Sequence, residues 1–272
     1  MIENLYLKAI LTSIVEGLTE FVPVSSTGHM ILFGRWIDFS GPQAETFSVF
    51  IQLGAILAAF LIYRQQFVGL IPKPGNEPFF KRLLWGENRP TAVHFIVAVL
   101  PILVAGLLLH KVIKERLFSA DVVAYGLIIG GALMIIVEKL PKKLHTESVD
   151  QITVKQAFWI GIGQCMAVWP GMSRSGSTLV TSLLVGIKHK PAADFSFIIA
   201  VPVMVAAVSY DLLKSWSFLT ADDFGYFAIG FVVAFLVAWG SIRWFLTVLG
   251  SLGLVPFGVY RIAMGGLVLW LL

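Results

Sequence analysis

The sequence predicts an all-α polytopic integral membrane protein with six transmembrane helices and two re-entrant helical hairpins in an inverted-topology repeat. Three observations predict this fold class. Of the 272 residues, 57% are hydrophobic and 13% are charged, whereas a soluble globular domain is roughly one-quarter charged. Six stretches are apolar over lengths that can span a bilayer. Two short polar stretches, 23–29 and 170–178, interrupt the apolar chain.

The expected transmembrane helices are stretches of about 17–25 predominantly apolar residues. They are 46–63, 91–110, 121–140, 192–213, 224–243 and 254–271. Two further segments, 5–35 and 153–187, have a helical pattern that is broken by Pro23 and by Pro170 with Gly171. Each half of such a segment is too short to cross the bilayer alone. A re-entrant hairpin is therefore expected, with its irregular tip inside protein or beside a water-filled cavity.

The two halves of the chain are related by an internal repeat. Ser25 and Ser173 are 148 residues apart, and several identical pairs recur at that spacing without gaps: Ala9/Ala157, Ile14/Ile162, Gly28/Gly176, Phe47/Phe195, Ser48/Ser196, Ala58/Ala206 and Ala59/Ala207. A hairpin followed by three spans occurs twice, and an odd number of crossings inverts the second copy. The sequence thus predicts one membrane domain, 1–272, with inverted repeats at about 1–140 and 149–272. Such repeats place their broken helices near the midplane, facing each other.

Charge gives the expected orientation, because cytoplasmic loops are enriched in Lys and Arg. With the N-terminus outside, the inner loops hold Arg64, Lys73, Lys81, Arg82, Arg89, Lys139, Lys142, Lys143, Lys155, Lys188, Lys190 and Arg243. The outer loops hold Arg35, Lys111, Lys114, Arg116 and Lys214. Both termini are expected outside, and 73–82 is expected to be a cytoplasmic loop. The net charge of +4 is explained by these loops, so no nucleic-acid partner is expected.

Glu16 and Glu20 project from one helix face, since they are four residues apart. Their neighbours are apolar, and a charge at membrane depth costs about 2.5–3.5 kcal/mol. Two adjacent carboxylates also repel each other unless a cation lies between them. Hard divalent cations such as Mg²⁺ or Ca²⁺ take oxygen ligands of this kind. We expect these two residues to bind such a metal; the alternative is a solvated helix face.

Both polar stretches begin a new helix, with Ser25 or Ser26 as a natural N-cap of the first. Free amides at a helix N-terminus favour phosphate, and Arg174 offers a planar fork of donors that matches phosphate oxygens. The expected anion-binding residues are Ser25, Thr27, Gly28, Ser173, Ser175, Gly176 and Thr178. The alternative is close helix packing through small residues, which explains the glycines but gives no reason for Arg174.

His29 follows Ser26 by three residues, within reach across one helical turn. A nucleophile beside a base is the recurring arrangement of covalent catalysis, which makes this pair candidate catalytic residues. Gln52, Ser48, Ser196 and Arg261 are polar residues within apolar spans. Interhelical hydrogen bonding is their simplest role, and Gln52 is also a candidate substrate-binding residue.

The stretches EGLTEFVPVSSTGH (16–29) and PGMSRSGST (170–178) together resemble the undecaprenyl-diphosphatase family, also called the bacitracin-resistance proteins, and the resemblance extends over essentially the whole chain. It implies a metal-dependent hydrolase of the bacterial inner membrane, with its site toward the periplasm. Such an enzyme converts undecaprenyl diphosphate to the monophosphate and recycles this lipid carrier for peptidoglycan synthesis. The resemblance makes Glu16 and Glu20 the acidic motif, Ser26 and His29 the hydroxyl–imidazole pair, and Arg174 the phosphate-binding arginine, with Ser173 and Thr178 around it.

Several alternatives stay open at the level of sequence. Ser26 is the expected nucleophile with His29 or Glu20 as its base, but His29 or a water molecule can also attack. The lipid-phosphatase superfamily with a histidine nucleophile needs a second histidine after the arginine, and 175–188 contains none. A transporter or flippase is the alternative from another class, since broken helices in inverted repeats are usual there. A homodimer is neither required nor excluded.

Overall fold

The computed structural model describes residues 4–71, 78–85, 90–113, 117, 119–215 and 223–272, and helices dominate them. The helices are α1 (Leu5–Thr19), α2 (Ser26–Trp36), α3 (Pro42–Ile62), α4 (Arg64–Gly69), α5 (Phe79–Trp85), α6 (Ala92–Val112), α7 (Ala120–Lys139), α8 (Val154–Gln164), α9 (Arg174–Leu184), α10 (His189–Ser215), α11 (Phe224–Leu252) and α12 (Val255–Leu271). Two short 3-10 helices, η2 (Val149–Gln151) and η3 (Cys165–Val168), lie on either side of α8. The predicted all-α class is confirmed for these residues.

Five helices of the described chain are long and apolar enough to cross a membrane: α3, α6, α7, α10 and α11. This is the pattern of a multi-pass membrane protein. The sixth expected span forms α12, which has 17 residues and is shorter than the other five. At 1.5 Å per residue its length is about 25 Å, less than the roughly 30 Å of a hydrocarbon core. Gly253 separates it from α11 with a φ of 61°, a conformation that favours glycine.

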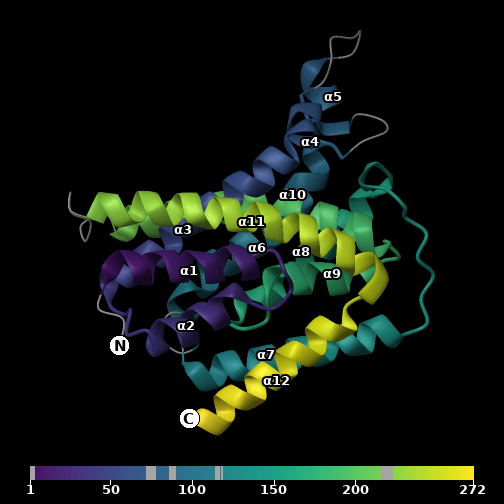
Figure 1. Cartoon of the computed structure of the whole chain (residues 1–272). Helices are drawn as coiled ribbons and strands as arrows, with labels where there is room; N and C mark the ends of the chain where they lie inside the picture. Colours follow the sequence, from purple (N-terminus) through teal and green to yellow (C-terminus); the bar gives the residue numbers. More distant parts are fainter. Residues whose placement is uncertain (1–3, 72–77, 86–89, 114–116, 118, 216–222) are drawn as a thin grey trace.

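The two segments expected to be broken are helical hairpins. Helix α1 ends at Thr19, before Pro23, and α2 begins at Ser26. Helix α8 starts with a capping box between Thr153 and Gln156, and α9 begins at Arg174 after the Pro170 turn. Helix α1 has 15 residues and the other three arms have 11 each, so none is long enough to span a bilayer. The two hairpins enter the molecule from opposite ends (Figure 1).

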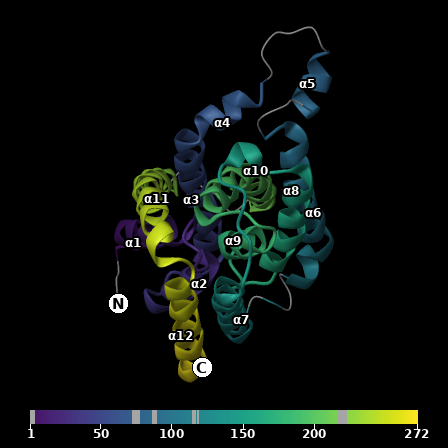
Figure 2. The same cartoon turned by 90° about the vertical axis from the view of Figure 1, so that its right-hand side faces the viewer.

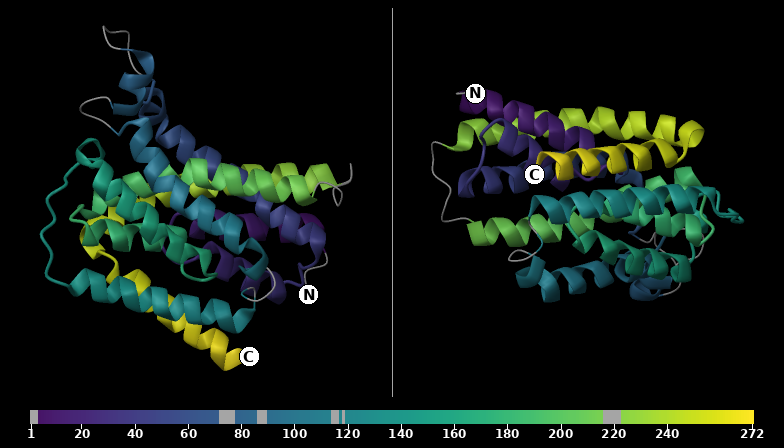
Figure 3. Two further views of the ribbon diagram at one scale, coloured as in Figure 1. Left: turned by 180° about the vertical axis from the view of Figure 1, so that it is seen from behind. Right: turned by 90° about the horizontal axis from the view of Figure 1, so that it is seen from below.

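The helices pack so that both hairpin tips lie inside the molecule. Helix α12 lies along α7 (Figure 1), while α11 packs against α1 and α3, and α6 against α8. The views from other sides show the same arrangement (Figures 2 and 3). At the first tip, the fully buried Phe21 ring meets the Phe197 ring of α10 edge-on, with 5.3 Å between centroids. The tip is therefore anchored in the main hydrophobic core.

Helices α4 and α5 project away from the rest of the molecule (Figure 2). The expected loop at 73–82 overlaps this projection: 79–82 belong to α5, and 72–77 lie outside the described residues. The expected connection between spans thus contains a short helix at 79–82, which apolar residues at helical spacing, such as Phe79, Phe80 and Leu83, favour. Of the expected loop cations, Lys73, Arg89, Lys114 and Arg116 also lie outside the described residues.

Candidate active site

The two hairpin tips have the same backbone conformation. Ser25 and Ser173 have φ values of 73° and 66°, in a region that residues other than glycine seldom adopt. Each is the N-cap of the following helix: the Ser25 hydroxyl accepts from the Gly28 N–H at 3.4 Å, and the Ser173 hydroxyl from the Gly176 N–H at 3.2 Å. Of the two N-cap candidates at the first tip, Ser25 and Ser26, the structure therefore selects Ser25. These helices begin with Ser26 in one copy and Arg174 in the other.

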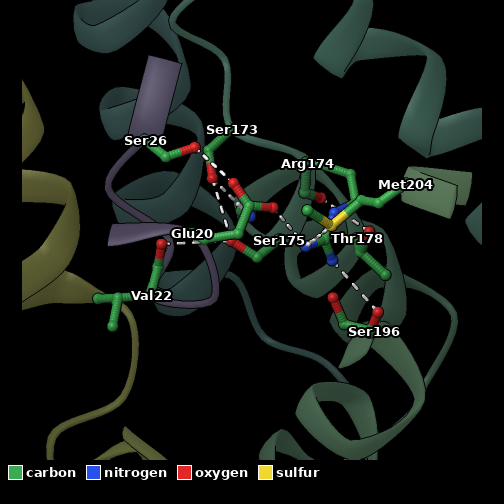
Figure 4. A network of polar contacts seen from close by, with 10 residues as sticks. Glu20, Val22, Ser26, Ser173, Arg174, Ser175, Thr178, Ser196 and Met204 are labelled. Carbon is green, nitrogen blue, oxygen red and sulfur yellow. Dashed lines mark hydrogen bonds and ion pairs between the residues drawn. The ribbon is translucent and has the colours of Figure 1, made fainter. Parts of the chain in front are cut away.

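The Glu20 carboxylate joins the tips (Figure 4). Its Oε2 accepts a hydrogen bond from the Ser26 hydroxyl at 2.5 Å, and its Oε1 lies 3.0 Å from an Nη atom of Arg174. The Arg174 and Glu20 side chains are 11% and 10% exposed, so the ion pair is largely shielded from solvent. Charge-assisted hydrogen bonds in such surroundings are short and strong. The structure thus brings together three of the expected residues, from two hairpins that are remote in sequence.

Arg174 is held by groups on three sides. One Nη donates to the Ser196 carbonyl of α10 at 3.3 Å, and the other lies 3.5 Å from the Met204 sulfur. The guanidinium lies over the Phe21 ring, 5.6 Å from its centroid. Its Nε is buried without a hydrogen-bond partner in the described part of the chain. One buried N–H donor of the guanidinium is therefore left over, and an anion can accept a hydrogen bond from it.

The second tip contributes hydroxyl groups next to Arg174 (Figure 4). The Ser173 and Ser175 oxygens are 3.1 Å apart, and the Ser175 hydroxyl donates to the Val22 carbonyl of the first tip at 3.3 Å. The Thr178 hydroxyl donates to the Arg174 carbonyl at 2.8 Å. Ser175 therefore helps to hold the tips together, whereas the Thr178 hydroxyl is used within α9.

Glu16 lies one turn before Glu20 and is almost completely buried, with 1% of its surface exposed. Its Oε1 has no hydrogen-bond partner among the described residues. An orphaned carboxylate oxygen in apolar surroundings is costly, which makes it a candidate metal ligand. Within the described ranges, no group of three or more His, Cys, Asp or Glu side chains is placed to hold a metal. Glu16 and Glu20 are two carboxylates one helical turn apart, so a metal on them would need further ligands from substrate or water.

His29 is turned away from Ser26. Its Nδ1 lies 2.8 Å from the Ser25 carbonyl and its Nε2 lies 2.6 Å from the hydroxyl of Tyr260 in α12. The expected hydroxyl–imidazole hydrogen bond is therefore not formed, because the Ser26 hydroxyl donates to Glu20 instead. Sequence reasoning missed Tyr260, which lies 231 residues away.

Two other expected binding residues lie apart from this network. Thr27 is exposed at the start of α2. Gln52 is half-buried in α3, and no hydrogen bond joins it to either tip in the part of the chain that the structure describes. The Ser48 hydroxyl, expected to bond between helices, donates to the Ala44 carbonyl of its own helix at 2.8 Å. A hydroxyl on a helix can always reach the carbonyl four residues earlier, and sequence alone does not exclude this.

Arg261 of α12 forms hydrogen bonds to α7 and to both tips. This agrees with its expected role in interhelical hydrogen bonding. It is fully buried. Its guanidinium donates to the carbonyls of Gly171 and Met172 at 2.8 and 2.9 Å, and to that of Gly126 in α7 at 3.2 Å. It also lies 3.5 Å from the Pro23 carbonyl.

A cavity formed by described residues lies away from the two tips. It has a volume of about 610 Å³ and contains none of the tip residues; its lining is His145, Thr146, Gln151, Thr153, Lys155, Gln156, Trp159 and Val185.

Comparison with known proteins agrees with the resemblance noted in the two tip sequences. Residues 9–267 match the family described as bacitracin resistance protein BacA. The undecaprenyl-diphosphatase of Geobacillus thermodenitrificans (strain NG80-2) is 46% identical over 271 residues, which cover 97% of each chain. That of Geobacillus kaustophilus (strain HTA426) is 46% identical over 270 residues, again 97% of each. Undecaprenyl-diphosphatase 1 of Bacillus anthracis is 47% identical over 254 residues, 93% of each.

Proposed function

The chain belongs to the bacitracin resistance protein BacA family, and we propose that it is an undecaprenyl-diphosphatase of the bacterial inner membrane. It hydrolyses undecaprenyl diphosphate to undecaprenyl phosphate and inorganic phosphate at a site that opens toward the periplasm. The product is the lipid carrier for peptidoglycan synthesis, and its recycling gives resistance to bacitracin. The names of the relatives support the reaction, and the polar tips buried among apolar helices suit a substrate with a charged head and a lipid tail.

The observation that carries this proposal is the contact of Ser26, Glu20 and Arg174. A hydroxyl that donates to a carboxylate is arranged as a nucleophile beside its base. The same carboxylate is paired with a guanidinium, whose donors match phosphate oxygens. The reacting oxygen and the phosphate-binding cation therefore come from two tips that meet at one point.

The reaction follows from this geometry. The Ser26 oxygen bonds to the terminal phosphorus while the bond between that phosphorus and the bridging oxygen breaks, and the Ser26 proton passes to Glu20. Undecaprenyl phosphate leaves. The oxygen of a water molecule then bonds to the phosphorus of the phosphoserine while the bond between phosphorus and the serine oxygen breaks. Glu20 returns the proton to Ser26, and the water oxygen leaves with its protons as part of inorganic phosphate. Arg174 offsets charge on the transferring phosphoryl group, usually the largest contribution in phosphoryl transfer.

Glu20 is a better candidate than His29 for the base. The Ser26 hydroxyl already donates to Glu20 at 2.5 Å, whereas both ring nitrogens of His29 are bonded to other groups. Because both ring nitrogens are already hydrogen-bonded, His29 is also a poorer candidate for the nucleophile. Trapping the phosphoenzyme distinguishes the schemes, and phosphate found on His29 would overturn the serine scheme.

We also propose a divalent cation, Mg²⁺ or Ca²⁺, on Glu16 and Glu20. Two carboxylates and the guanidiniums of Arg174 and Arg261 give the tips no net formal charge, so a diphosphate adds negative charge that a cation would offset. Mg²⁺ is commonly held by one or two carboxylates together with substrate phosphates and water, which fits the orphaned oxygen of Glu16. When bound, the metal would act as a Lewis acid on phosphate oxygens.

The finer architecture is part of the same proposal: α12 is a sixth span, the hairpins are re-entrant, and the halves form an inverted repeat. Helices α2 and α9 support the repeat, since both begin and end 148 residues apart. Their N-caps also share an unusual φ. The 17 residues of α12 are at the lower limit for a transmembrane helix.

The first test measures phosphate release from undecaprenyl or farnesyl diphosphate by purified protein in detergent, with Mg²⁺ or Ca²⁺ and with a chelator. We expect metal-dependent release, and a loss of at least about 100-fold in Ser26→Ala and Arg174→Ala, the scale of removing a catalytic group or an oxyanion donor. Ser251→Ala and Arg243→Ala are matched controls at exposed positions of α11. No release by folded wild type that binds the substrate tightly would favour a flippase instead.

A further inference from the structure

The hydrogen bonds of His29 define its tautomer. The carbonyl oxygen of Ser25 can only accept, so the Nδ1 atom at 2.8 Å carries the proton. In the neutral ring Nε2 is then an acceptor, and the Tyr260 hydroxyl donates to it at 2.6 Å. The two ring planes are inclined by only 5°. The imidazole is therefore held at both nitrogens.

Tyr260, His29 and the Ser25 carbonyl form a chain of hydrogen bonds. The carbonyl at its end belongs to a residue with an unfavourable backbone conformation. Ser25 has a φ of 73°, and such a backbone persists when surrounding contacts hold it in place. Its carbonyl receives both the His29 backbone N–H, at 3.3 Å, and the His29 ring. Ser25 directly precedes Ser26, so its conformation sets the direction of the Ser26 hydroxyl toward Glu20.

The second tip lacks this chain of hydrogen bonds. The residue that corresponds to His29 at the 148-residue spacing is Ser177, whose backbone N–H donates to the Ser173 carbonyl at 2.9 Å. The Ser177 hydroxyl has no partner among the described residues. The imidazole thus supports the tip that carries Ser26, and not the tip that carries Arg174.

We propose that Tyr260 is a positioning residue of the active site. Through His29 it holds the carbonyl of Ser25, which keeps the Ser26 hydroxyl on Glu20. His29 is then a positioning residue as well, and the proton of Ser26 passes to Glu20 alone. This inference rests on the proposed diphosphatase activity, and it adds a contribution of α12, outside both tip sequences, to the reaction.

The test is a double-mutant cycle of Tyr260→Phe and His29→Ala, with kcat and KM for phosphate release from farnesyl diphosphate. Tyr260→Phe removes only the hydroxyl of a half-exposed ring. We expect its kcat to fall about tenfold, as for the loss of one hydrogen bond, with KM within about twofold of wild type. His29→Ala should cost more, and adding Tyr260→Phe to it should cost nothing further, because the chain is already broken.

Tyr125→Phe is the matched control, since Tyr125 lies in α7 and is 50% exposed against 44% for Tyr260. It should keep the wild-type kcat. Three results would overturn the inference: a wild-type kcat in Tyr260→Phe, losses that multiply in the double variant, or a tenfold rise of KM, which indicates that Tyr260 binds the substrate directly. The first of these results overturns the inference even if the melting temperature of Tyr260→Phe is lower, because kcat is expressed per folded protein. Wild type without phosphate release contradicts the proposed function itself, so the two failures are distinguishable.

Discussion

At the scale of single residues, Arg261 is the unusual one. Its guanidinium is fully buried and, among the described residues, it donates to carbonyl groups and a methionine sulfur but to no carboxylate. Several carbonyl dipoles together replace the water that a buried charge has lost. Three of these carbonyls belong to tip residues, namely Pro23, Gly171 and Met172. The positively charged guanidinium therefore stabilises the contact between the two tips.

Replacing this residue should loosen both tips at once. Arg261→Met keeps an unbranched apolar stem but removes the guanidinium that donates to the carbonyls of Gly126, Gly171 and Met172. We expect a loss of at least about 3 kcal/mol of unfolding free energy, since each bond to a charged donor contributes about 1.5–3 kcal/mol. Thermal unfolding in detergent measures it, together with phosphate release. Arg243→Met, at an exposed arginine whose guanidinium lies over Trp239, should change stability by about 1 kcal/mol or less. Equal effects of the two substitutions would contradict this role.

At the scale of elements, the backbone of the second tip lies in close contact with α7. A Cβ atom at Gly126 would collide with the Pro170 carbonyl, and one at Gly171 with the Val123 carbonyl. The Trp169 indole N–H adds a hydrogen bond to the Val122 carbonyl at 3.1 Å. The Arg261 side chain of α12 contacts both tips, whereas the Tyr260 hydroxyl bonds only to His29, beside the first tip.

A matched pair of glycine substitutions tests this packing. Gly126→Ala in α7 should destabilise the protein by about 1–3 kcal/mol through overpacking and should reduce phosphate release, because the tip carrying Arg174 must shift. Gly240→Ala in α11 has open space around the added Cβ, and its higher helix propensity should leave stability unchanged or raise it by up to about 1 kcal/mol. Melting temperatures in detergent give the comparison. If Gly126→Ala leaves the melting temperature unchanged, α7 can move to make room for the added methyl group, and this packing is not required for stability.

The two broken helices and part of the site could be predicted from the sequence, because they depend on local residues. Pro23 and Pro170 break their helices whatever surrounds them, and a serine before a new helix is an N-cap in any fold. The proximity of Glu20 to Arg174 could be predicted from the repeat, which places the two tips opposite each other. The turn of His29 toward Tyr260 was not, because it depends on how α12 packs under the first tip, which no spacing within the repeat encodes. The helix at 79–85 and the extension of α11 to Leu252, beyond the expected end at 243, likewise depend on boundaries that apolar patterns define poorly.

At the scale of the whole molecule, exposed basic residues lie at the open ends of the two hairpins. Arg35 lies at the open end of the first hairpin and Lys155 at the open end of the second, and both are exposed. If the halves are inverted, these ends face opposite sides of the membrane while the tips meet between them. The arrangement would let a lipid headgroup reach both tips near the midplane. The 3.0 Å contact between Arg174 and Glu20 shows that the two tips meet.

Thiol labelling measures this orientation directly. Cys165 is the only cysteine of the chain, so Cys165→Ser gives a background to which Arg35→Cys or Lys155→Cys is added. With a membrane-impermeant maleimide, we expect Arg35→Cys to react in intact spheroplasts and Lys155→Cys to react only in inside-out vesicles, because the basic loops stay in the cytoplasm. The cysteine-free background controls for nonspecific labelling, and phosphate release shows that each variant is folded. Reaction of both cysteines from the same side would exclude the inverted repeat and would require the tips to meet by another topology.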